Sequence, residues 1–513
     1  MSDGVKPVHV VVVGGGIGGL SSAIALAARG CRVTLLERAA RVGGKMSAVR
    51  VSDRTVDSGP TVLTMRWVFD ELFASAGTTL EEHVTLVPSE VLARHAWTDG
   101  TRLDLFADPE RSRRAVVETF GREAGAAFVR FREDSRRIYE TVLEPFLRSQ
   151  RPDVTSMLKW TAGHGLGAFT RIDAFRTMWA ALTQAFREPK LRQLFGRYAT
   201  YCGSSPFEAP ATLNLVAHVE SEGVFRVAGG MDALARSLEN LASSLGVVIH
   251  VGHEVERIVV ENGAATGVVV NGDTIGADAV VFNGDVDALG RALLGERAKG
   301  AADPTPVSKR SLSAITWALV GRASDFPLVH HNVFFSDDYE AELETLMARR
   351  RVPETPTVYL CAQDRADVTA DLDDERMLLV VNAPPTGDEP ARWSEAERSR
   401  CTETTFETLR RCGLRLEPRA TTQSTPVELA ARFPSTGGAL YGPIAHGPFS
   451  ALARHGARTK VRSLYLAGGS VHPGPGVPMC ALSGRLAAEQ LSNDLASTTL
   501  SRRRAIRGIT STP

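Results

Sequence analysis

A glycine-rich turn between an apolar strand and a helix constrains the fold more than any other feature of the sequence. Residues 11–46 read VVVGGGIGGLSSAIALAARGCRVTLLERAARVGGKM. The β-branched run ends in Gly14, Gly16 and Gly19, spaced as G-x-G-x-x-G, and a helix is expected over about 20–29. A strand, a turn and a helix can be joined with far fewer glycines. The pattern therefore indicates that a bulky anionic group approaches the backbone closely.

The residues that follow complete a β-α-β unit. A second strand is expected over 31–36, and Glu37 stands at its end. In such a unit the glycines permit a tight turn, close approach of a pyrophosphate, and packing of the helix on the strand. The helix N-terminus binds phosphates and the Glu37 carboxylate accepts ribose hydroxyls. The alternative is a glycine-rich turn that binds nothing. We predict an α/β fold with a doubly wound, Rossmann-like dinucleotide domain.

Composition limits the other possibilities. A chain of 513 residues exceeds one hydrophobic core, so at least two domains are expected. The 59 basic and 59 acidic residues balance, which gives no support to a nucleic-acid partner. The six scattered cysteines contain no C-x-x-C, which indicates a reducing, cytoplasmic compartment. No apolar run approaches the roughly 18 to 20 residues of a membrane-spanning helix, and no secretory signal is expected.

Metal and hydrolase motifs are not expected. His253 begins a run that resembles the zinc motif H-E-x-x-H, but position 257 is Arg and the run reads as a strand. His330 and His331 are adjacent, and on a strand they would point apart. No G-x-S-x-G nucleophile motif occurs.

The same patterns divide the chain. Residues 1–85, 224–300 and 455–495 look like the separated segments of one discontinuous nucleotide-binding domain. Residues 86–223, largely helical by period, and 301–454, with strands such as 312–320, are expected to form an inserted α+β substrate domain. The basic tail, 496–513, is expected to be disordered.

The run after Glu37 resembles the E-x-x-x-x-x-G-G-[KR] extension of the FAD-containing amine oxidase and carotenoid desaturase superfamily. Here it contains Arg38, Gly44 and Lys45. The resemblance implies FAD as cofactor, with a second glycine pair beside the flavin and a lysine that offsets phosphate charge. Arg38 alternatively is a solvated loop charge. The run DSGPT resembles the loop beside the isoalloxazine ring, which implies cofactor contacts from Gly59, Pro60 and Thr61.

The C-terminal run 465–479, YLAGGSVHPGPGVPM, resembles the segment whose helix N-terminus faces the flavin. That likeness implies contacts from Gly468, Gly469, Val477, Pro478 and Met479. Free N–H groups there would stabilise negative charge on the reduced flavin. Many superfamily members have an acid after the first glycine, but this chain has Gly469, so backbone N–H groups are expected to replace it. The strand position of Val255 implies a backbone contact with the adenine.

Longer blocks, such as LFGRYATYCGSSP, HHNVFFSDDY, VYLCAQDR and RFPSTGGALYG, are similar to the carotenoid desaturase family, and within it to the 1-hydroxycarotenoid 3,4-desaturases. The resemblance spans nearly the whole chain. It implies hydride transfer to flavin and a new C-3,4 double bond in an acyclic 1-hydroxycarotenoid. Alternatives are a phytoene or neurosporene desaturase, a carotenoid ketolase, a flavin amine oxidase acting on a polar substrate, or a non-catalytic flavoprotein.

The same resemblance suggests few catalytic side chains, because the substrate's conjugation stabilises the charge. His472 is a candidate proton acceptor; alternatively it shapes the turn before Pro473. The longer blocks bring a set of polar residues into an apolar tunnel, where they pair with the substrate hydroxyl or with each other. This set is Arg197, Tyr201, His331, Asn332 and Gln363.

A water-insoluble substrate implies peripheral contact with a membrane surface, expected at the inner membrane. Residues 157–160 and 169–179 are the candidate surface. Because the sequence lacks a separate NAD(P) fingerprint, oxygen or a quinone is the expected electron acceptor.

Overall fold

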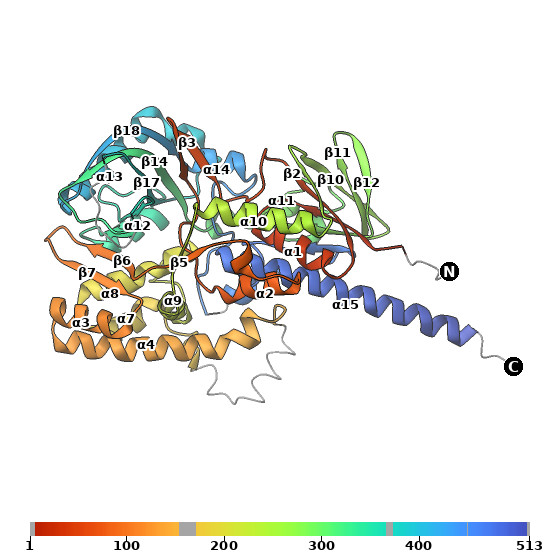
Figure 1. The fold of residues 1–513 in the computed structure, drawn as a ribbon, viewed down its shortest axis with the longest axis horizontal. Coiled ribbons are helices and arrows are strands. Elements are labelled where there is room, and N and C mark those ends of the chain that lie inside the picture. Colours follow the sequence, from red (N-terminus) through yellow and green to blue (C-terminus); the bar gives the residue numbers. More distant parts are fainter. Residues whose placement is uncertain (1–5, 153–170, 366–372, 449, 510–513) are drawn as a thin grey trace.

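The computed structural model describes residues 6–152, 171–365, 373–448 and 450–509. Two sheets form its framework (Figure 1), a parallel sheet of five strands and a larger sheet of seven. The long C-terminal helix α15 (Val477–Ile509) runs along the side of the parallel sheet and projects beyond it.

The parallel sheet has the strand order β19-β13-β1-β2-β9. Every neighbouring pair in it is parallel. Its strands come from three distant parts of the chain: β1 (His9–Val13), β2 (Arg32–Glu37), β9 (Val248–Val251), β13 (Ala279–Phe282) and β19 (Leu464–Leu466). This assembly of distant segments is what the sequence predicted for the cofactor domain, and the α/β fold class is confirmed.

Both faces of this sheet are covered. Val10 and Val12 of β1 point into a core formed with the helices α1 (Ile17–Ala27), α2 (Trp67–Ser75), α10 (Met231–Ser244) and α15. Val11 and Val13 point into a second core, beneath an antiparallel sheet of β10 (Val255–Glu261), β11 (Ala264–Val270) and β12 (Asp273–Gly276). A strand buried on both faces has to be apolar at successive positions, which explains the uninterrupted valine run.

The seven-stranded sheet has the order β18-β14-β17-β16-β15-β6-β7. Its neighbours are antiparallel, except for the parallel pair β15–β6. Both insertions contribute strands to it: β6 (Val91–Ala96), β7 (Arg102–Phe106), β14 (Ser313–Ser324), β15 (His331–Phe334), β16 (Val358–Ala362), β17 (Glu375–Ala383) and β18 (Arg415–Ser424). The two insertions are therefore one structural unit at the level of the backbone.

Helices of the first insertion lie below this sheet in Figure 1. They are α3 (Pro109–Phe120), α4 (Arg122–Val142) with the π-helical turn η2 (Leu143–Leu147), α7 (Met178–Ala185), α8 (Pro189–Gly196), the 3-10 turns η3 (Arg197–Cys202) and η4 (Ala211–Asn214), and α9 (Leu215–Ser221). Asp108 caps α3 by accepting from the N–H of Glu110 at 2.7 Å, directly before Pro109 at the first helical position.

The remaining elements belong to the second insertion and to the connections between the two sheets. The helices of the second insertion are α12 (Tyr339–Met347), α13 (Glu395–Arg411) and α14 (Pro426–Arg432), with the 3-10 turns η7 (Pro390–Trp393) and η8 (Ser450–Ala453). The small strands and other turns are β3 (Ala48–Val51), β4 (Arg54–Asp57), β5 (Leu86–Pro88), β8 (Phe225–Val227), η1 (Leu80–Glu82), α11 (Val286–Gly290), η5 (Lys299–Ala301) and η6 (Val307–Lys309).

The C-terminal tail differs from the prediction. Residues 496–509 continue α15 rather than forming a disordered tail. A basic, Ser/Thr-rich composition reads as disordered, but the preceding helix already supplies the nucleus from which further turns propagate. The exact domain boundaries stay a prediction. Within the described part of the chain, no helix has the length and apolar character needed to cross a bilayer.

Candidate cofactor and substrate site

A cavity of about 1870 Å³ lies between the two sheets. One side is built by loops at the carboxyl ends of the parallel strands, where α/β sheets bind ligands. The other side is built by both insertions. Among the residues predicted to bind the cofactor, all except Gly19 line this cavity.

The glycine turn is packed so closely that side chains would not fit. Gly14 has a φ of +100°, and a Cβ at Gly18 would lie 2.5 Å from Asn283 Oδ1. Gly19 lies under the turn, where a Cβ would be 2.0 Å from the carbonyl oxygen of Gly14. Gly19 therefore has the packing role predicted for the third glycine. No side chain of the described residues caps the N-terminus of α1 at Gly16, so its first N–H groups stay open to a ligand.

Glu37 ends β2 and is buried at the cavity wall. Its carboxylate accepts from the N–H groups of Gly15 and Ala39, each at 2.7 Å. A carboxylate has about four acceptor positions, so two remain for ribose hydroxyls. Glu37 thus organises the turn as well as facing the cavity.

The second glycine pair packs directly on the first turn. Gly43 donates to the carbonyl of Gly15 at 2.8 Å, and a Cβ at Gly44 would lie 3.1 Å from the Cα of Gly16. Both glycines have positive φ values, +113° and +60°, which other residues rarely adopt. The glycines at 43 and 44 are explained by this close approach of two loops.

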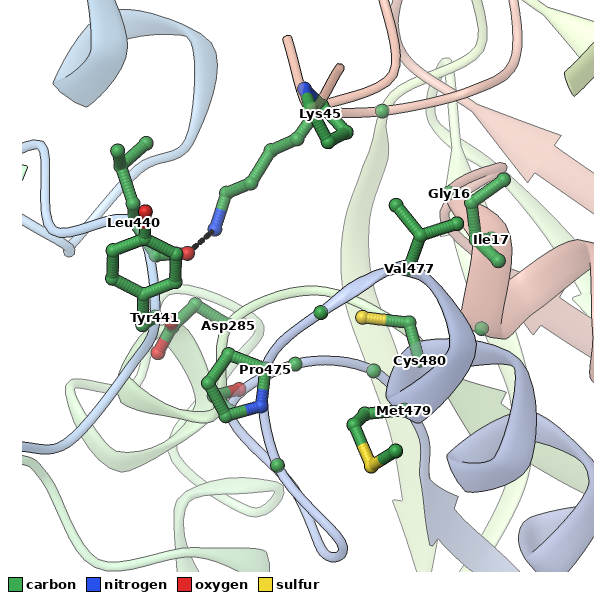
Figure 2. Close-up of a pocket in the computed structure, with 18 of the residues that line it drawn as sticks. Gly16, Ile17, Lys45, Asp285, Leu440, Tyr441, Pro475, Val477, Met479 and Cys480 are labelled. Atoms are coloured by element: carbon green, nitrogen blue, oxygen red, sulfur yellow. Dashed lines mark hydrogen bonds between the residues drawn. The ribbon is translucent and has the colours of Figure 1, made fainter. Parts of the chain in front are cut away.

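The two basic residues near this pair reach across to the second insertion. Arg38 donates to the carbonyl of Ala431 at 2.7 Å and pairs with Glu254 at 3.5 Å. The Lys45 ammonium donates to the carbonyl of Leu440 across the cavity (Figure 2). Burial lowers the pKa of Lys45, while the nearby carboxylate of Asp285 opposes this change. The phosphate role predicted for Lys45 differs from this contact and stays a prediction.

Side-chain hydrogen bonds fix the loop that is expected beside the flavin ring. Gln363 clamps the backbone of Asp57, donating to its carbonyl at 2.8 Å and accepting from its N–H at 3.0 Å. The Asp57 carboxylate accepts from the N–H of Met231 at 2.8 Å. Thr61 Oγ1 lies 2.6 Å from the hydroxyl of Tyr359, which also lines the cavity.

The C-terminal segment closes the same side. After β19 the chain passes Gly468, which has a φ of +112°, and enters α15 at Val477. Figure 2 shows Val477 beside Gly16 and Ile17, at the start of that helix. Two helix N-termini, α1 and α15, therefore face one cavity. Val255 begins β10 and lines the same cavity.

These groups fit an FAD. The glycine turn leaves no room for side chains, so a pyrophosphate can approach the backbone. The helix N-termini stabilise negative charge on the phosphates and on the reduced flavin ring, and the Glu37 carboxylate can accept hydrogen bonds from a ribose. The residues that would hold it are those of the glycine turn, Glu37, the loop at Gly59–Thr61 and the start of α15.

His472 does not line the cavity. Its Nε2 lies 3.0 Å from the carbonyl oxygen of Ser149, and its ring meets Phe146 edge-on at 4.7 Å. Burial lowers the pKa of His472 to about 4. The geometry favours the alternative, in which His472 shapes the turn before Pro473.

The predicted substrate residues divide into two groups. Arg197 and Tyr201 line the cavity. His331, Asn332 and Gln363 do not line the cavity. The side chains of Asn332 and Gln363 and the Nδ1 of His331 have partners elsewhere in the protein, whereas the buried Nε2 of His331 has none among the described residues. Their substrate role stays a prediction. Asn332 accepts from the N–H of Val329 at 3.0 Å and donates to its carbonyl at 2.6 Å.

The two adjacent histidines do not point apart, because His330 precedes β15 rather than lying within it. Their rings form an edge-on pair with centroids 4.5 Å apart, and His330 Nε2 lies 3.6 Å from Cys361 Sγ. His331 Nδ1 lies 2.7 Å from the hydroxyl of Tyr359. Ligand atoms of His330, His331 and Cys361 all lie within 4.8 Å of one another. The expectation of no metal stays a prediction.

The sequence reasoning missed Glu220, Tyr198, Tyr359 and Asn283. Tyr201 donates to Glu220 Oε1 at 3.0 Å, Arg197 donates to the Tyr201 hydroxyl at 2.8 Å, and Tyr198 donates to the other carboxylate oxygen of Glu220. The sequence did contain an indication of Glu220: in the run LVAHVE it lies at helical spacing from aliphatic residues, which predicts that it shares their side of the helix. We call Arg197, Tyr198, Tyr201 and Glu220 the polar cluster.

Comparisons with known proteins agree with this geometry. The family described as flavin-containing amine oxidoreductase matches residues 17–492. Hydroxyneurosporene desaturase of Rubrivivax gelatinosus is 49% identical, covering 100% of this chain and 98% of the relative. Hydroxyneurosporene desaturase of Cereibacter sphaeroides is 43% identical (95% and 98% covered), and a 1-hydroxycarotenoid 3,4-desaturase of Flavobacterium is 31% identical (94% and 99%).

A solved structure of putrescine oxidase has the same fold. It is 14% identical, with a TM-score of 0.60, and the alignment covers 96% of this chain and 99% of that one. The family match confirms FAD as the cofactor and bears out the resemblance seen in the sequence, and the solved structure shows that the fold is shared.

Proposed function

We propose, from the premise that the chain belongs to the flavin-containing amine oxidoreductase family and to its carotenoid desaturases, that it forms the C-3,4 double bond of an acyclic 1-hydroxycarotenoid. The observation that carries this proposal is the 49% identity over the whole chain to a hydroxyneurosporene desaturase. A relative named a 1-hydroxycarotenoid 3,4-desaturase supports the position of the new bond.

The cavity walls suit a long apolar substrate. The wall residues from the first insertion include Val142, Phe146, Leu147, Ile172, Leu213 and Val216. They adjoin the cofactor loops within a single cavity, so a polyene can lie beside the flavin. Such an apolar wall does not favour an amine oxidase reaction on a small polar substrate.

The polar cluster supplies a partner for the substrate hydroxyl. Arg197 is 7% exposed, and its Nε has no hydrogen-bond partner among the described residues. A buried N–H without an acceptor is costly, and the oxygen of a tertiary alcohol is such an acceptor. We infer that Arg197 and Tyr201 bind the C-1 hydroxyl. A site built for a hydroxyl rejects the analogue that lacks it by roughly 10⁴-fold or more.

The chain contributes geometry to the reaction. Bound FAD supplies the acceptor for a hydride. Residues 59–61 form one side of the place where C-4 must lie: Thr61 contacts Tyr359, and Gln363 fixes the backbone of the preceding Asp57. Holding the reacting carbon about 3 to 3.5 Å from its acceptor supplies much of the rate enhancement. The apolar wall excludes water from the cation that forms along the polyene.

We further propose peripheral contact with the cytoplasmic face of the inner membrane, and oxygen or a quinone as acceptor. Ile172 and Ala174 line the cavity, whereas the neighbouring Phe175 is 65% exposed. This segment supports a route from the surface into the cavity. The expected surface residues 157–160 and 169–170 lie outside the described residues. Flotation with liposomes tests the contact; protein that stays in the aqueous fraction at low and high salt would refute it.

The substrate proposal is tested with purified holoenzyme and three carotenoids: phytoene, neurosporene and its 1-hydroxy derivative. We expect turnover of the hydroxylated compound, with the absorption spectrum and mass of a product that has one additional double bond. Equal turnover of neurosporene, or a first new double bond away from C-3,4, would place the protein with the general desaturases.

A further inference from the structure

Helix α9 presents a single carboxylate within an aliphatic wall. Leu215, Val216, Val219 and Glu220 all face the cavity, since these positions share one side of the helix. Three are aliphatic and the fourth is an acid. A carboxylate at an apolar wall is costly to keep ionised, so its presence requires a reason beyond packing.

The hydrogen bonds keep this carboxylate as an acceptor. Both oxygens of Glu220 accept from tyrosine hydroxyls, one from Tyr201 at 3.0 Å and the other from Tyr198. The guanidinium of Arg197 acts through Tyr201, to which it donates at 2.8 Å. No ion pair within 4.0 Å joins Glu220 to a basic residue in the described parts of the chain. Glu220 therefore keeps acceptor positions that no cation occupies.

The surroundings of Glu220 act on its pKa in opposite directions. Burial raises the pKa of Glu220, whereas hydrogen bonds from the two tyrosines and the charge of Arg197 oppose that rise. The titratable and charged groups that face Glu220 are Arg197, Tyr198 and Tyr201, all from η3. Burial also raises the pKa values of both tyrosines, so they remain protonated donors.

The substrate's own covalent structure places a proton beside this carboxylate. Only the C-2 methylene separates the hydroxyl-bearing C-1 from C-3. A hydroxyl held by Arg197 and Tyr201 therefore places C-3 next to the residue that Tyr201 contacts, which is Glu220. C-4 is one bond further and adjoins the polyene, which stabilises the positive charge.

We propose that Glu220 is the catalytic residue that accepts the proton lost from C-3, an inference that rests on the proposed function. The hydride would leave C-4 for the acceptor that bound FAD supplies, which leaves a cation at C-4. The electron pair of the C-3–H bond then becomes the new π bond, and the proton moves to a Glu220 oxygen. Glu220 becomes a neutral carboxylic acid and must lose this proton before the next turnover.

Asp285 is the main competing carboxylate in the cavity. Its oxygen accepts from the N–H of Asp287 at 3.0 Å, as the cap of α11, and it lies beside Lys45 (Figure 2). This places Asp285 on the cofactor side, between a helix N-terminus and an ammonium. Glu220 instead lies on the wall of the first insertion, within the polar cluster.

The decisive experiment compares holoenzymes of the wild type, Glu220→Gln and Glu222→Gln with the 1-hydroxycarotenoid. Glu222 is on the same helix and pairs with His218 away from the cavity lining. Anaerobic flavin reduction should slow by about 10²- to 10⁴-fold in Glu220→Gln, as for other lost general bases, and by less than about 3-fold in Glu222→Gln. FAD content and substrate affinity, measured by fluorescence quenching, should change little in either variant.

A second variant keeps the test informative if Glu220→Gln does not fold. Tyr198→Phe removes one donor from the Glu220 carboxylate and leaves the cavity lining intact. Loss of that donor raises the pKa of Glu220, because hydrogen bonds to the charged form stabilise it. The acidic limb of the pH–rate profile should move to higher pH in this variant.

The outcomes separate the two proposals. Wild-type rates in Glu220→Gln, or an acidic limb that stays in place in Tyr198→Phe, would overturn the role of Glu220. A wild-type enzyme that does not oxidise the 1-hydroxycarotenoid but does oxidise another carotenoid would instead contradict the proposed function.

Discussion

The side chain of Asn283 donates to the carbonyl of Gly14 at 3.2 Å, although 269 residues separate them. Asn283 follows β13 and its own N–H donates to Val13 at 2.8 Å. The same amide lies under Gly16 and Gly18, where a Cβ would meet it at 2.9 Å and 2.5 Å. The second segment of the cofactor domain thus supports the turn made by the first.

Gly18→Ala tests this contact. An alanine within helix α1 would ordinarily gain about 0.5–1 kcal/mol over glycine. Here the new methyl would meet Asn283 Oδ1 and the backbone of Gly468, so we expect a loss of about 1–3 kcal/mol instead. Thermal unfolding measures this loss of stability. Titration with FAD measures the affinity for the cofactor, which should fall. Gly276→Ala is the control, because open space surrounds that position. A stabilised Gly18→Ala protein with normal FAD content would contradict the expected packing.

Glu37→Gln tests the proposed ribose contact. The amide keeps the size of the side chain but removes the charge that accepts from Gly15 and Ala39. A hydrogen bond to a charged group contributes about 1.5–3 kcal/mol, so FAD affinity should fall by about 10- to 100-fold. Calorimetric titration of the apoprotein measures it. Glu261→Gln, at the exposed end of β10, should leave the affinity unchanged. An unchanged FAD affinity in Glu37→Gln would show that Glu37 does not contact the cofactor.

Glu375→Ala tests a buried ion pair in the seven-stranded sheet. Arg365 meets Glu375 through two hydrogen bonds, at 2.7 Å and 2.8 Å, and their side chains are only 5% and 0% exposed. Removing the carboxylate leaves a buried guanidinium unpaired, so the free energy of unfolding should fall by about 3–5 kcal/mol. Glu407→Ala breaks the exposed pair with Arg410 and should leave the free energy of unfolding nearly unchanged, because water screens that pair. Urea unfolding followed by circular dichroism distinguishes them; equal losses would argue against the buried pair.

Tyr201→Phe tests substrate recognition by the polar cluster. The variant loses the hydroxyl that Arg197 and Glu220 share, so the hydroxylated substrate loses its organised partners. We expect the ratio of kcat/KM for 1-hydroxyneurosporene over neurosporene to fall at least about 10-fold, the effect of roughly 1.4 kcal/mol. Thr316→Val also removes a hydroxyl from the cavity lining, on β14, and should leave the ratio unchanged. An unchanged ratio in Tyr201→Phe would show that other residues recognise the substrate hydroxyl.

The sequence by itself determined the local units. The valine run, the glycine turn and the helix after it follow from short-range rules for φ and periodicity, and Glu37 had to stand at the end of β2. The resemblance of the run after Glu37 identified FAD, and that of the longer blocks identified the carotenoid desaturases. Helix α15 continues through 496–509, where the composition predicted disorder, so composition is here a weaker guide than the preceding helix.

Only the tertiary structure decided which polar residues face the cavity. His331, Asn332 and Gln363 stand in blocks that resemble a substrate site, yet none of the three lines the cavity. Glu220 was unremarked in the sequence, and it reaches the cavity because α9 turns its aliphatic side toward the cavity. The physical reason is that periodicity assigns a residue to one side of its own element. What that side meets depends on the packing of segments distant in the chain, as Asn283 and Gly14 illustrate.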